Sequence, residues 1–211
     1  MSDAAKTLQS LIQDRQHNRI LRVSFINKDG PKAELLINRL DASEALSRDF
    51  SYTVELLSND AHIPLKLMMG KQLCVELIRS DGTPRYYTGF IDSFRLKRTD
   101  GAVAFYEAHL VPWLAYIKAG KDSQVFHQLS LQELTAKVFA DYGALATWDC
   151  AVHHDDPSVT ERVMFNESPA NFLHRRWEDL GWHYHYEHTA KGHTLKLSDD
   201  STYVAAIDGK S

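Results

Sequence analysis

The sequence lacks the features that mark secreted, membrane-spanning or nucleic-acid-binding chains. Only two of its 211 residues are cysteines, Cys74 and Cys150, and their wide spacing favours free buried thiols over a disulfide or a metal site. No apolar run approaches the roughly 20 residues that a membrane-spanning helix needs, and the first residues lack the charged-then-apolar order of a secretory signal. The formal net charge of -4 gives no support to nucleic-acid binding. We therefore expect a chain made in the cytoplasm, with no nucleic-acid partner and no stable membrane insertion.

Motifs for common catalytic chemistries are also missing. The sequence contains no Gly-x-Ser-x-Gly elbow, no glycine-rich phosphate loop, no Cys-x-x-Cys and no helical His-Glu-x-x-His. Among its eleven histidines, two groups offer ligand types suited to zinc or iron, namely His183 with His185 on one strand face, and the loop His153, His154, Asp155 and Asp156. Neither group has the spacing of a known metal site, so solvated polar residues are the favoured interpretation.

Three other groups of residues have both a chemical and a structural interpretation. The acid pairs Asp155-Asp156 and Asp199-Asp200 could serve glycoside hydrolysis, although adjacent acids in such loops more often form turns. The basic runs Arg175-Arg176 and Lys97-Arg98 are typical of solvated faces. The aromatic residues Trp177, Trp182, Tyr184 and Tyr186 could stack on a sugar or base, but their spacing favours a core or subunit interface.

From these patterns we predict that the chain is not an enzyme. We assign no catalytic, cofactor-binding or metal-binding residues and no cofactor. A metal-dependent or glycan-cleaving enzyme that uses the loop 153–156 is the alternative from a different class.

Strand patterns dominate residues 19–111. Alternating apolar residues predict strands at 19–27 and 32–40, joined as a hairpin by the turn at 28–31, and another strand at 50–57. Strands at 72–79, 85–97 and 102–111, separated by turns, predict a three-stranded meander. Gly89 within the longest strand predicts a bulge or bend. Six such strands favour a small closed or nearly closed barrel, because closure removes exposed sheet edges.

Helical patterns follow after Pro112. Ser130 and Glu133 form a capping box before a helix that Gly143 ends. Ser168 as N-cap and Gly181 just past the C-terminus bound a second helix. Short strands are predicted at 148–152, 162–166, 182–187 and 193–197, with a short helix or arm at 3–14. The predicted fold class is mainly β with inserted helices, α+β.

Several blocks of sequence carry a family resemblance. In order they are LSRDFSYTVELLS (46–58), LMMGK (67–71), RYYTGFI (85–91), YEAHLVPWL (106–114), KAGKDSQVF (118–126), FADYG (139–143) and NESPANFLHRRWEDLGWHYHYEH (166–188). Together they resemble the VgrG spike proteins of bacterial type VI secretion, whose N-terminal region is similar to the hub of contractile phage tails. One departure is Val111, where the family usually has an arginine.

The resemblance implies a fold of antiparallel β-barrel modules of the phage tail hub type. It implies a structural role as the base of a trimeric spike, in which a homotrimer docks on the hexameric Hcp tube and takes part in delivering effectors. Baseplate components and effector or adaptor proteins would be further partners. The chain would be cytoplasmic during assembly and then secreted by the type VI machinery without a signal peptide. A hub protein of a contractile phage tail or tailocin is the alternative within the same structural family.

The same resemblance gives a domain organisation. We predict an N-terminal arm or short helix at 1–18, a first antiparallel β-barrel module at 19–116, and an α/β segment at 117–211 that leads into an incomplete second barrel. We expect the OB-like neck and β-helical needle of the family to lie outside this sequence.

Overall fold

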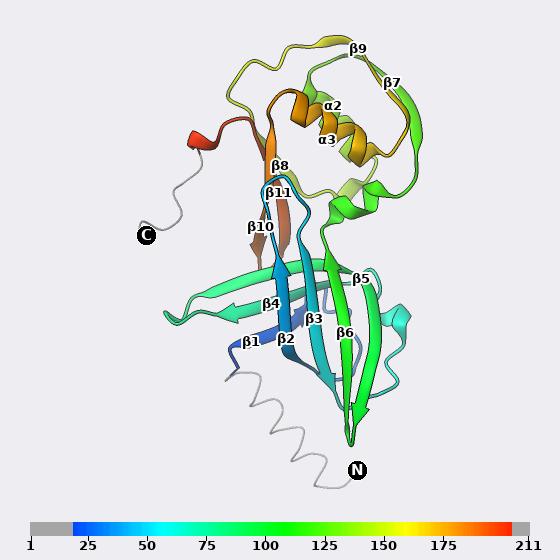
Figure 1. Cartoon of the computed structure of the whole chain (residues 1–211), viewed down its shortest axis with the longest axis vertical. Coiled ribbons are helices and arrows are strands. Elements are labelled where there is room, and N and C mark those ends of the chain that lie inside the picture. Colours follow the sequence, from blue (N-terminus) through cyan, green and yellow to red (C-terminus); the bar gives the residue numbers. More distant parts are fainter. Residues whose placement is uncertain (1–18, 204–211) are drawn as a thin grey trace. The chain divides into compact units, whose positions relative to one another are not determined.

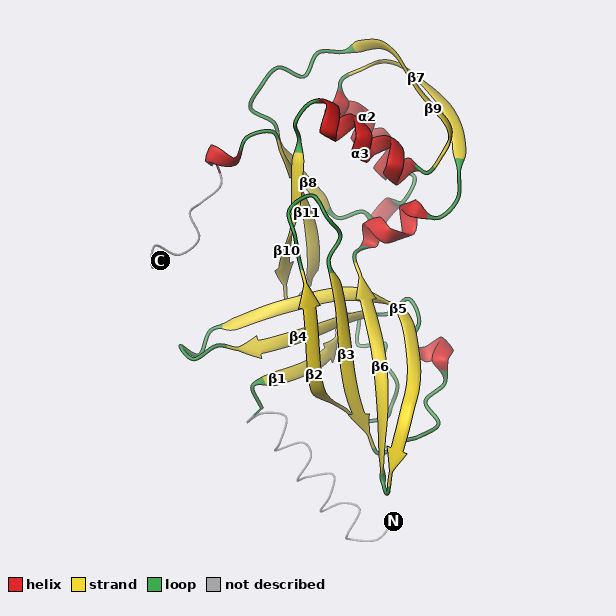
Figure 2. Cartoon of the chain, in the orientation of Figure 1, coloured by secondary structure: helices red, strands yellow, loops and turns green. Residues whose placement is uncertain are grey.

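The computed structural model describes residues 19–203, so the helix or arm predicted at 3–14 lies outside the described residues. Strands make up most of the regular structure, with a few helices between them (Figures 1 and 2). The chain divides into two compact units, and each combines segments that are distant in sequence. The first unit contains the described residues up to Ser43, then Phe50–Pro112 and His188–His193, and the second contains the remainder. The predicted fold class is confirmed.

A curled antiparallel sheet forms the first unit. Its six strands lie in the order β1-β4-β5-β6-β3-β2, and the two edge strands contact each other, so the sheet approaches a closed barrel. The predicted meander is confirmed as β4, β5 and β6. The elements of this unit are β1 (Leu21–Phe25), β2 (Leu35–Ser43), β3 (Ser51–Ser58), the 3-10 helix η1 (Leu65–Leu67), β4 (Gln72–Ile78), β5 (Pro84–Asp100) and β6 (Val103–Val111).

The hairpin predicted from the first two strands is wrong. β1 pairs with β4, where Val23 lies opposite Val75, and β2 pairs with β3 at the other end of the sheet order. The connection from Ile26 to Glu34 is longer than the two to five residues typical of a hairpin loop. The turn at 28–31 therefore ends a strand without joining it to the next one.

Gly89 has a different role from the predicted one. The pairing of β4 with β5 runs through Gly89 without a shift, and the register shifts of β5 against β6 fall between Ile91 and Ser93 and between Leu96 and Arg98. A Cβ atom at position 89 would lie 3.0 Å from the Leu110 Cβ atom and 3.0 Å from a Phe50 ring carbon. A Cβ atom here would be tight against both neighbours, so glycine favours the close approach of the strands, and the register shifts in β5 lie beyond it.

The tip of a later hairpin belongs to the first unit. This hairpin consists of β10 (His183–Thr189) and β11 (Gly192–Ser198), and its residues His188–His193 are grouped with the six-stranded sheet. The His188 Nε2 atom lies 3.0 Å from the Tyr52 hydroxyl, and its Nδ1 atom accepts the Thr88 N–H at 3.1 Å. The His193 side chain is buried, with its ring 5.1 Å from that of Phe50.

The second unit contains the α-helices α2 and α3 and two smaller sheets. A three-stranded sheet has the order β10-β11-β8, with β11 parallel to β8, and a two-stranded sheet pairs β7 with β9. Sequence reasoning missed β7, since no strand was predicted between Pro112 and the helix that follows Ser130. The remaining elements are η2 (Trp113–Lys118), β7 (Asp122–Leu129), α2 (Leu131–Ala140), η3 (Gly143–Leu145), β8 (Trp148–Ala151), β9 (Val159–Glu167), α3 (Pro169–Asp179) and η4 (Ser201–Tyr203).

Both predicted helix starts are confirmed. In α2 the Ser130 hydroxyl accepts the Glu133 N–H at 3.2 Å, and the Glu133 carboxylate accepts the Ser130 N–H at 2.9 Å. In α3 the Ser168 hydroxyl accepts the Asn171 N–H at 3.2 Å. These bonds satisfy N–H groups that have no partner within the helix, which explains why the capping pattern located both starts correctly.

Within residues 19–203, no helix is both long and apolar enough to cross a membrane. The predicted boundary at 116/117 assumed modules continuous in sequence, and it stays a prediction. Two segments of the structure are not continuous in this way: Glu44–Asp49 belongs to the second unit, and His188–His193 belongs to the first.

Candidate functional site

The histidine-rich loop is held in place by a carboxylate from elsewhere in the chain. Asp199 accepts the backbone N–H of His153 at 2.9 Å and that of His154 at 2.7 Å, and it lies 3.0 Å from the His154 Nδ1 atom. Its side chain is only 4% exposed. Burial alone would raise the pKa of Asp199, but these donors outweigh it and lower the pKa to about 2. Asp199, predicted as half of an acid pair with Asp200, is therefore an ionised anchor of the loop.

Asp156, an acidic residue of the loop itself, caps a helix. The two carboxylate oxygens of Asp156 accept the N–H groups of Leu131 and Gln132, each at 2.8 Å, at the start of α2. A negative charge at this end is also favoured by the helix dipole. In the part of the chain that the structure describes, no three or more His, Cys, Asp and Glu side chains are grouped to hold a metal ion.

Several other residues considered from the sequence have structural partners. Lys97 forms ion pairs with Glu107 at 3.0 Å and Glu55 at 3.5 Å, and Arg175 pairs with Glu167. These basic side chains therefore have carboxylate partners. Buried side chains of the second unit include Trp177, Trp182 and Tyr184, while Tyr186 donates its hydroxyl to Asp49 at 3.0 Å.

Both cysteines are free and poorly suited to act as nucleophiles. Burial raises the pKa of Cys74 to about 11. Burial, followed by the nearby carboxylates of Asp156, Asp149 and Asp199, raises the pKa of Cys150 to about 12. Because the thiolate is the reactive form, both thiols are unreactive near neutral pH.

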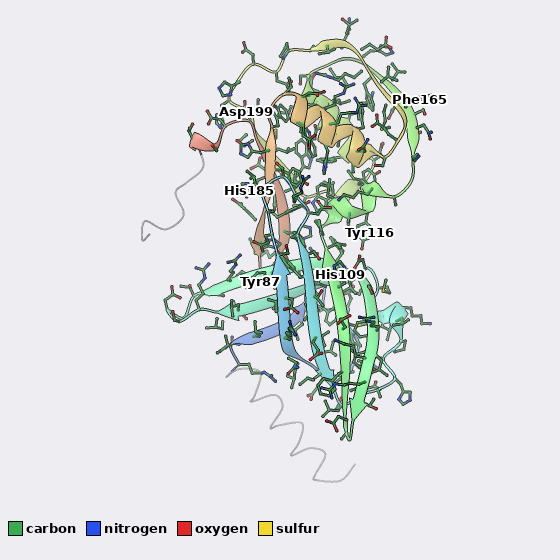
Figure 3. All side chains as sticks on the ribbon, viewed as in Figure 1. Tyr87, His109, Tyr116, Phe165, His185 and Asp199 are labelled. Atoms are coloured by element: carbon green, nitrogen blue, oxygen red, sulfur yellow. The ribbon has the colours of Figure 1, made fainter. Side chains whose placement is uncertain are left out.

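An exposed apolar surface lies on the ribbon formed by β7 and β9. The ribbon curves over α2 and α3 (Figure 1), and its inner face buries Phe126 and Met164. The outer face carries exposed apolar side chains, among them Val125 at 45%, Val163 at 42% and Phe165 at 76% exposure. Val125 and Val163 are direct cross-strand partners, and Figure 3 labels Phe165 on the same ribbon. We call these three residues the ribbon face.

The ribbon has the features of a surface that another chain covers. Within the described residues, β7 and β9 pair only with each other, so each has an open edge of backbone donors and acceptors. Open edges next to exposed apolar side chains favour pairing with another polypeptide. Sequence reasoning missed this surface because β7 was not predicted. The consecutive apolar residues Val163, Met164 and Phe165 could have indicated it, since they place apolar groups on both faces of one strand.

Comparison with known proteins places this architecture among phage tail hubs and type VI secretion spikes. The chain is 29% identical over 184 residues to the type VI secretion system spike protein VgrG1c of Pseudomonas aeruginosa, covering 87% of this chain and 25% of that protein. It is also 26% identical over 158 residues to the actin cross-linking toxin VgrG1 of Vibrio cholerae, covering 75% of this chain and 14% of that protein. The chain thus spans about a quarter or less of the length of these relatives.

Solved structures share the fold. The Escherichia coli c3393 protein, described as a component of the type VI secretion system similar to the phage T4 tail proteins gp27 and gp5, aligns with a TM-score of 0.77 at 16% identity. That alignment covers 89% of this chain and 51% of the other. A 43 kDa tail protein of prophage MuSo2 from Shewanella oneidensis aligns with a TM-score of 0.52 at 14% identity over 79% of this chain and 53% of the other. The family profile of the phage tail baseplate hub (GPD) matches residues 43–211, and the chain therefore belongs to the phage tail baseplate hub family.

Proposed function

We propose that the chain forms the structural base of a type VI secretion spike, assembles as a homotrimer and docks on the hexameric Hcp tube. The observation that carries this proposal is the similarity to type VI spike proteins along 87% of the chain. The role needs shape and interfaces, which the curled sheet and the helical unit supply. Baseplate components and effector or adaptor proteins are the further partners in this proposal, with delivery of effectors as the outcome.

The ribbon face supports self-association. A ring of identical chains needs two different surfaces on each copy, one of which meets the other on the next copy. The ribbon offers two different open edges, that of β7 and that of β9, next to the exposed side chain of Phe165. We take a second copy of this chain as the partner that covers the ribbon face.

The proposal includes the route that the protein follows. The chain would assemble in the cytoplasm and leave the cell with the spike, driven by the machinery and without a signal peptide. A hub in a contractile phage tail or tailocin is the second candidate, because the fold is shared with a prophage tail protein.

Light scattering with and without purified Hcp tests the proposal. A mass three times the 24.1 kDa of one chain, which increases when an Hcp hexamer binds, is the expected result. A monomer that ignores Hcp would contradict both the trimer and the docking. Binding to a phage tail tube protein, without binding to Hcp, would favour the second candidate.

A further inference from the structure

Three polar residues on the outer face of the first unit form a hydrogen-bonded chain. The Ser51 hydroxyl lies 2.8 Å from the His109 Nε2 atom, and the His109 Nδ1 atom lies 2.7 Å from the Asp92 carboxylate. The three residues come from β3, β6 and β5, and Figure 3 labels His109. We call them the serine–histidine–aspartate chain.

Sheet register explains how these residues meet. Thr53 lies opposite His109 in the pairing of β3 with β6, and Ser51, two residues before Thr53, points to the same face because side chains alternate along a strand. On the other side His109 lies opposite Ser93 of β5, and the register shift between Ile91 and Ser93 leaves Asp92 as the extra residue. This bulge directs the Asp92 carboxylate toward His109, a common effect of bulges.

The strands that carry the serine–histidine–aspartate chain are held in place by buried side chains. Tyr52, Ile91 and Leu110 are each adjacent in sequence to one of the three residues, and all are fully buried. The polar side chains therefore project from a packed sheet, which is a more precise support than a loop.

The order of contacts defines a proton path. When the Nδ1–H of His109 donates to the Asp92 carboxylate, the Nε2 atom carries the lone pair and accepts the Ser51 hydroxyl proton. Serine hydrolases on unrelated folds use these residue types in the same order, and such triads are recognised by geometry and not by sequence position. The side chains of His109 and Asp92 are 35% and 40% exposed, so a small molecule can reach this surface.

We propose that Ser51 is a nucleophile for activated esters, with His109 as its general base and Asp92 as the positioning residue. The Ser51 oxygen bonds to the ester carbonyl carbon while its proton moves to the His109 Nε2 atom. The bond between the carbonyl carbon and the leaving-group oxygen then breaks, and the departing oxyanion, a phenoxide for an aryl ester, takes up that proton from His109. Water, activated by His109 in the same way, releases the acyl group as a carboxylic acid.

The substrate class follows from what the site supplies. General-base catalysis contributes typically ~10²–10⁴-fold to a rate, while one oxyanion-hole donor contributes a further ~10²–10³-fold. The described contacts provide the base and no assigned oxyanion donor. The chemistry is therefore confined to esters with good leaving groups, such as aryl esters, and acylation of Ser51 is easier to observe than turnover. This activity lies outside the hub role and does not depend on assembly.

The test is covalent labelling of the chain with 4-nitrophenyl acetate and with a fluorophosphonate probe, followed by intact mass and peptide mapping. We expect one label per chain at Ser51, none in Ser51→Ala, and a rate at least ~100-fold lower in His109→Gln. Asp92→Asn should slow labelling and change its pH profile, because the imidazole loses the partner that fixes its tautomer. A merely structural hydrogen bond would leave that profile unchanged.

Two matched variants serve as controls. Ser93→Ala removes a serine that lies opposite His109 on β5, and His62→Gln removes a histidine that is 94% exposed beside Asp60. Both should label at the native rate, and circular dichroism should show every variant to be folded. No label on the native chain, equal labelling of Ser51→Ala, or equal rates for native and His109→Gln would each overturn the proposal.

Discussion

A single buried histidine makes the first unit sensitive to acid. His193 is 3% exposed, and burial, with a smaller contribution from His188, lowers its pKa from 6.5 to about 3. The unfolded chain therefore binds a proton between pH 6.5 and 3 that the folded chain does not. The contribution of neutral His193 to the free energy of unfolding is therefore fully present above pH 6.5, and it is lost as the pH falls through this window.

We expect the free energy of unfolding to decrease by up to about 1.4 kcal/mol per pH unit across that window through His193 alone. In His193→Leu this contribution should vanish. The slope of the free energy of unfolding against pH should therefore decrease by the amount that corresponds to binding one proton. Urea unfolding at a series of pH values from 4 to 7 measures the slope. His62→Gln is the control, because this side chain is 94% exposed, and an unchanged slope in His193→Leu would contradict the assignment.

A second prediction concerns a buried hydrogen bond between side chains of α2 and α3. The Trp177 indole N–H donates to the Thr135 hydroxyl at 3.0 Å, and both residues are buried. Thr135→Val preserves the shape of the side chain but leaves the indole N–H without an acceptor, which should cost about 1–3 kcal/mol of stability. Thermal or urea unfolding measures the loss.

Thr147→Val is the control for that prediction. The Trp113 indole N–H donates to the backbone carbonyl of Thr147 at 3.0 Å, so this substitution retains the acceptor. Equal effects of the two substitutions would show that the Thr135 hydroxyl contributes nothing specific.

Residue roles could be predicted from the sequence where they depend on near neighbours. Ser130 with Glu133 and Ser168 with Asn171 are three residues apart, and both caps were located correctly. The contact of Ser51 with His109 joins residues 58 positions apart. No periodicity or local motif contains that information, because it depends on strand register and on a bulge at Asp92.

For helices, the loop 153–156 supplies a test that separates capping from metal binding. Asp156→Ala removes the acceptor of two N–H groups at the start of α2 and should cost about 1–2 kcal/mol. Amide exchange in Leu131–Ala140 should become faster, because the first turn is less well satisfied. Urea unfolding and hydrogen exchange measure the two effects.

Asp155→Ala is the matched control, since it removes the adjacent acid while Asp156 keeps the cap. We expect little change in either measurement. Suppose instead that both variants lose stability equally, and that added zinc stabilises the native chain but neither variant. That result would contradict the capping role and support the metal site.

The strands show why local signals are sufficient for some elements only. The meander of β4, β5 and β6 joins strands that follow one another, and turn residues located it. β1 and β2 also follow one another, yet they lie at the two ends of the sheet order. Their partners depend on contacts between segments that are distant in sequence, such as Val23 opposite the buried Val75, and pairing of that kind is not encoded in a turn.

For the whole molecule, the ribbon face provides the main test of assembly. Burying a Phe165 side chain that is 76% exposed should contribute about 1.5–3 kcal/mol to association. Phe165→Ser should therefore weaken self-association about tenfold to a hundredfold, while circular dichroism stays native. Sedimentation or light scattering over a range of protein concentrations measures the change.

Leu96→Ser is the comparison for Phe165→Ser, because Leu96 is 45% exposed on β5 of the first unit. Its association constant should match that of the native chain. If both substitutions weaken assembly equally, or neither does, the ribbon face is not the surface that the copies share.

The assignment of His188–His193 to the first unit affects how the protein is made. The last strand of that unit's sheet to be synthesised, β6, ends at Val111, but the buried ring of His193 must still be added. At about 5–20 residues per second, a ribosome needs on the order of ten seconds to reach it. Until then the nascent first unit exposes the aromatic side chains that His193 later covers, and a chaperone that recognises such surfaces would have its opportunity during that interval.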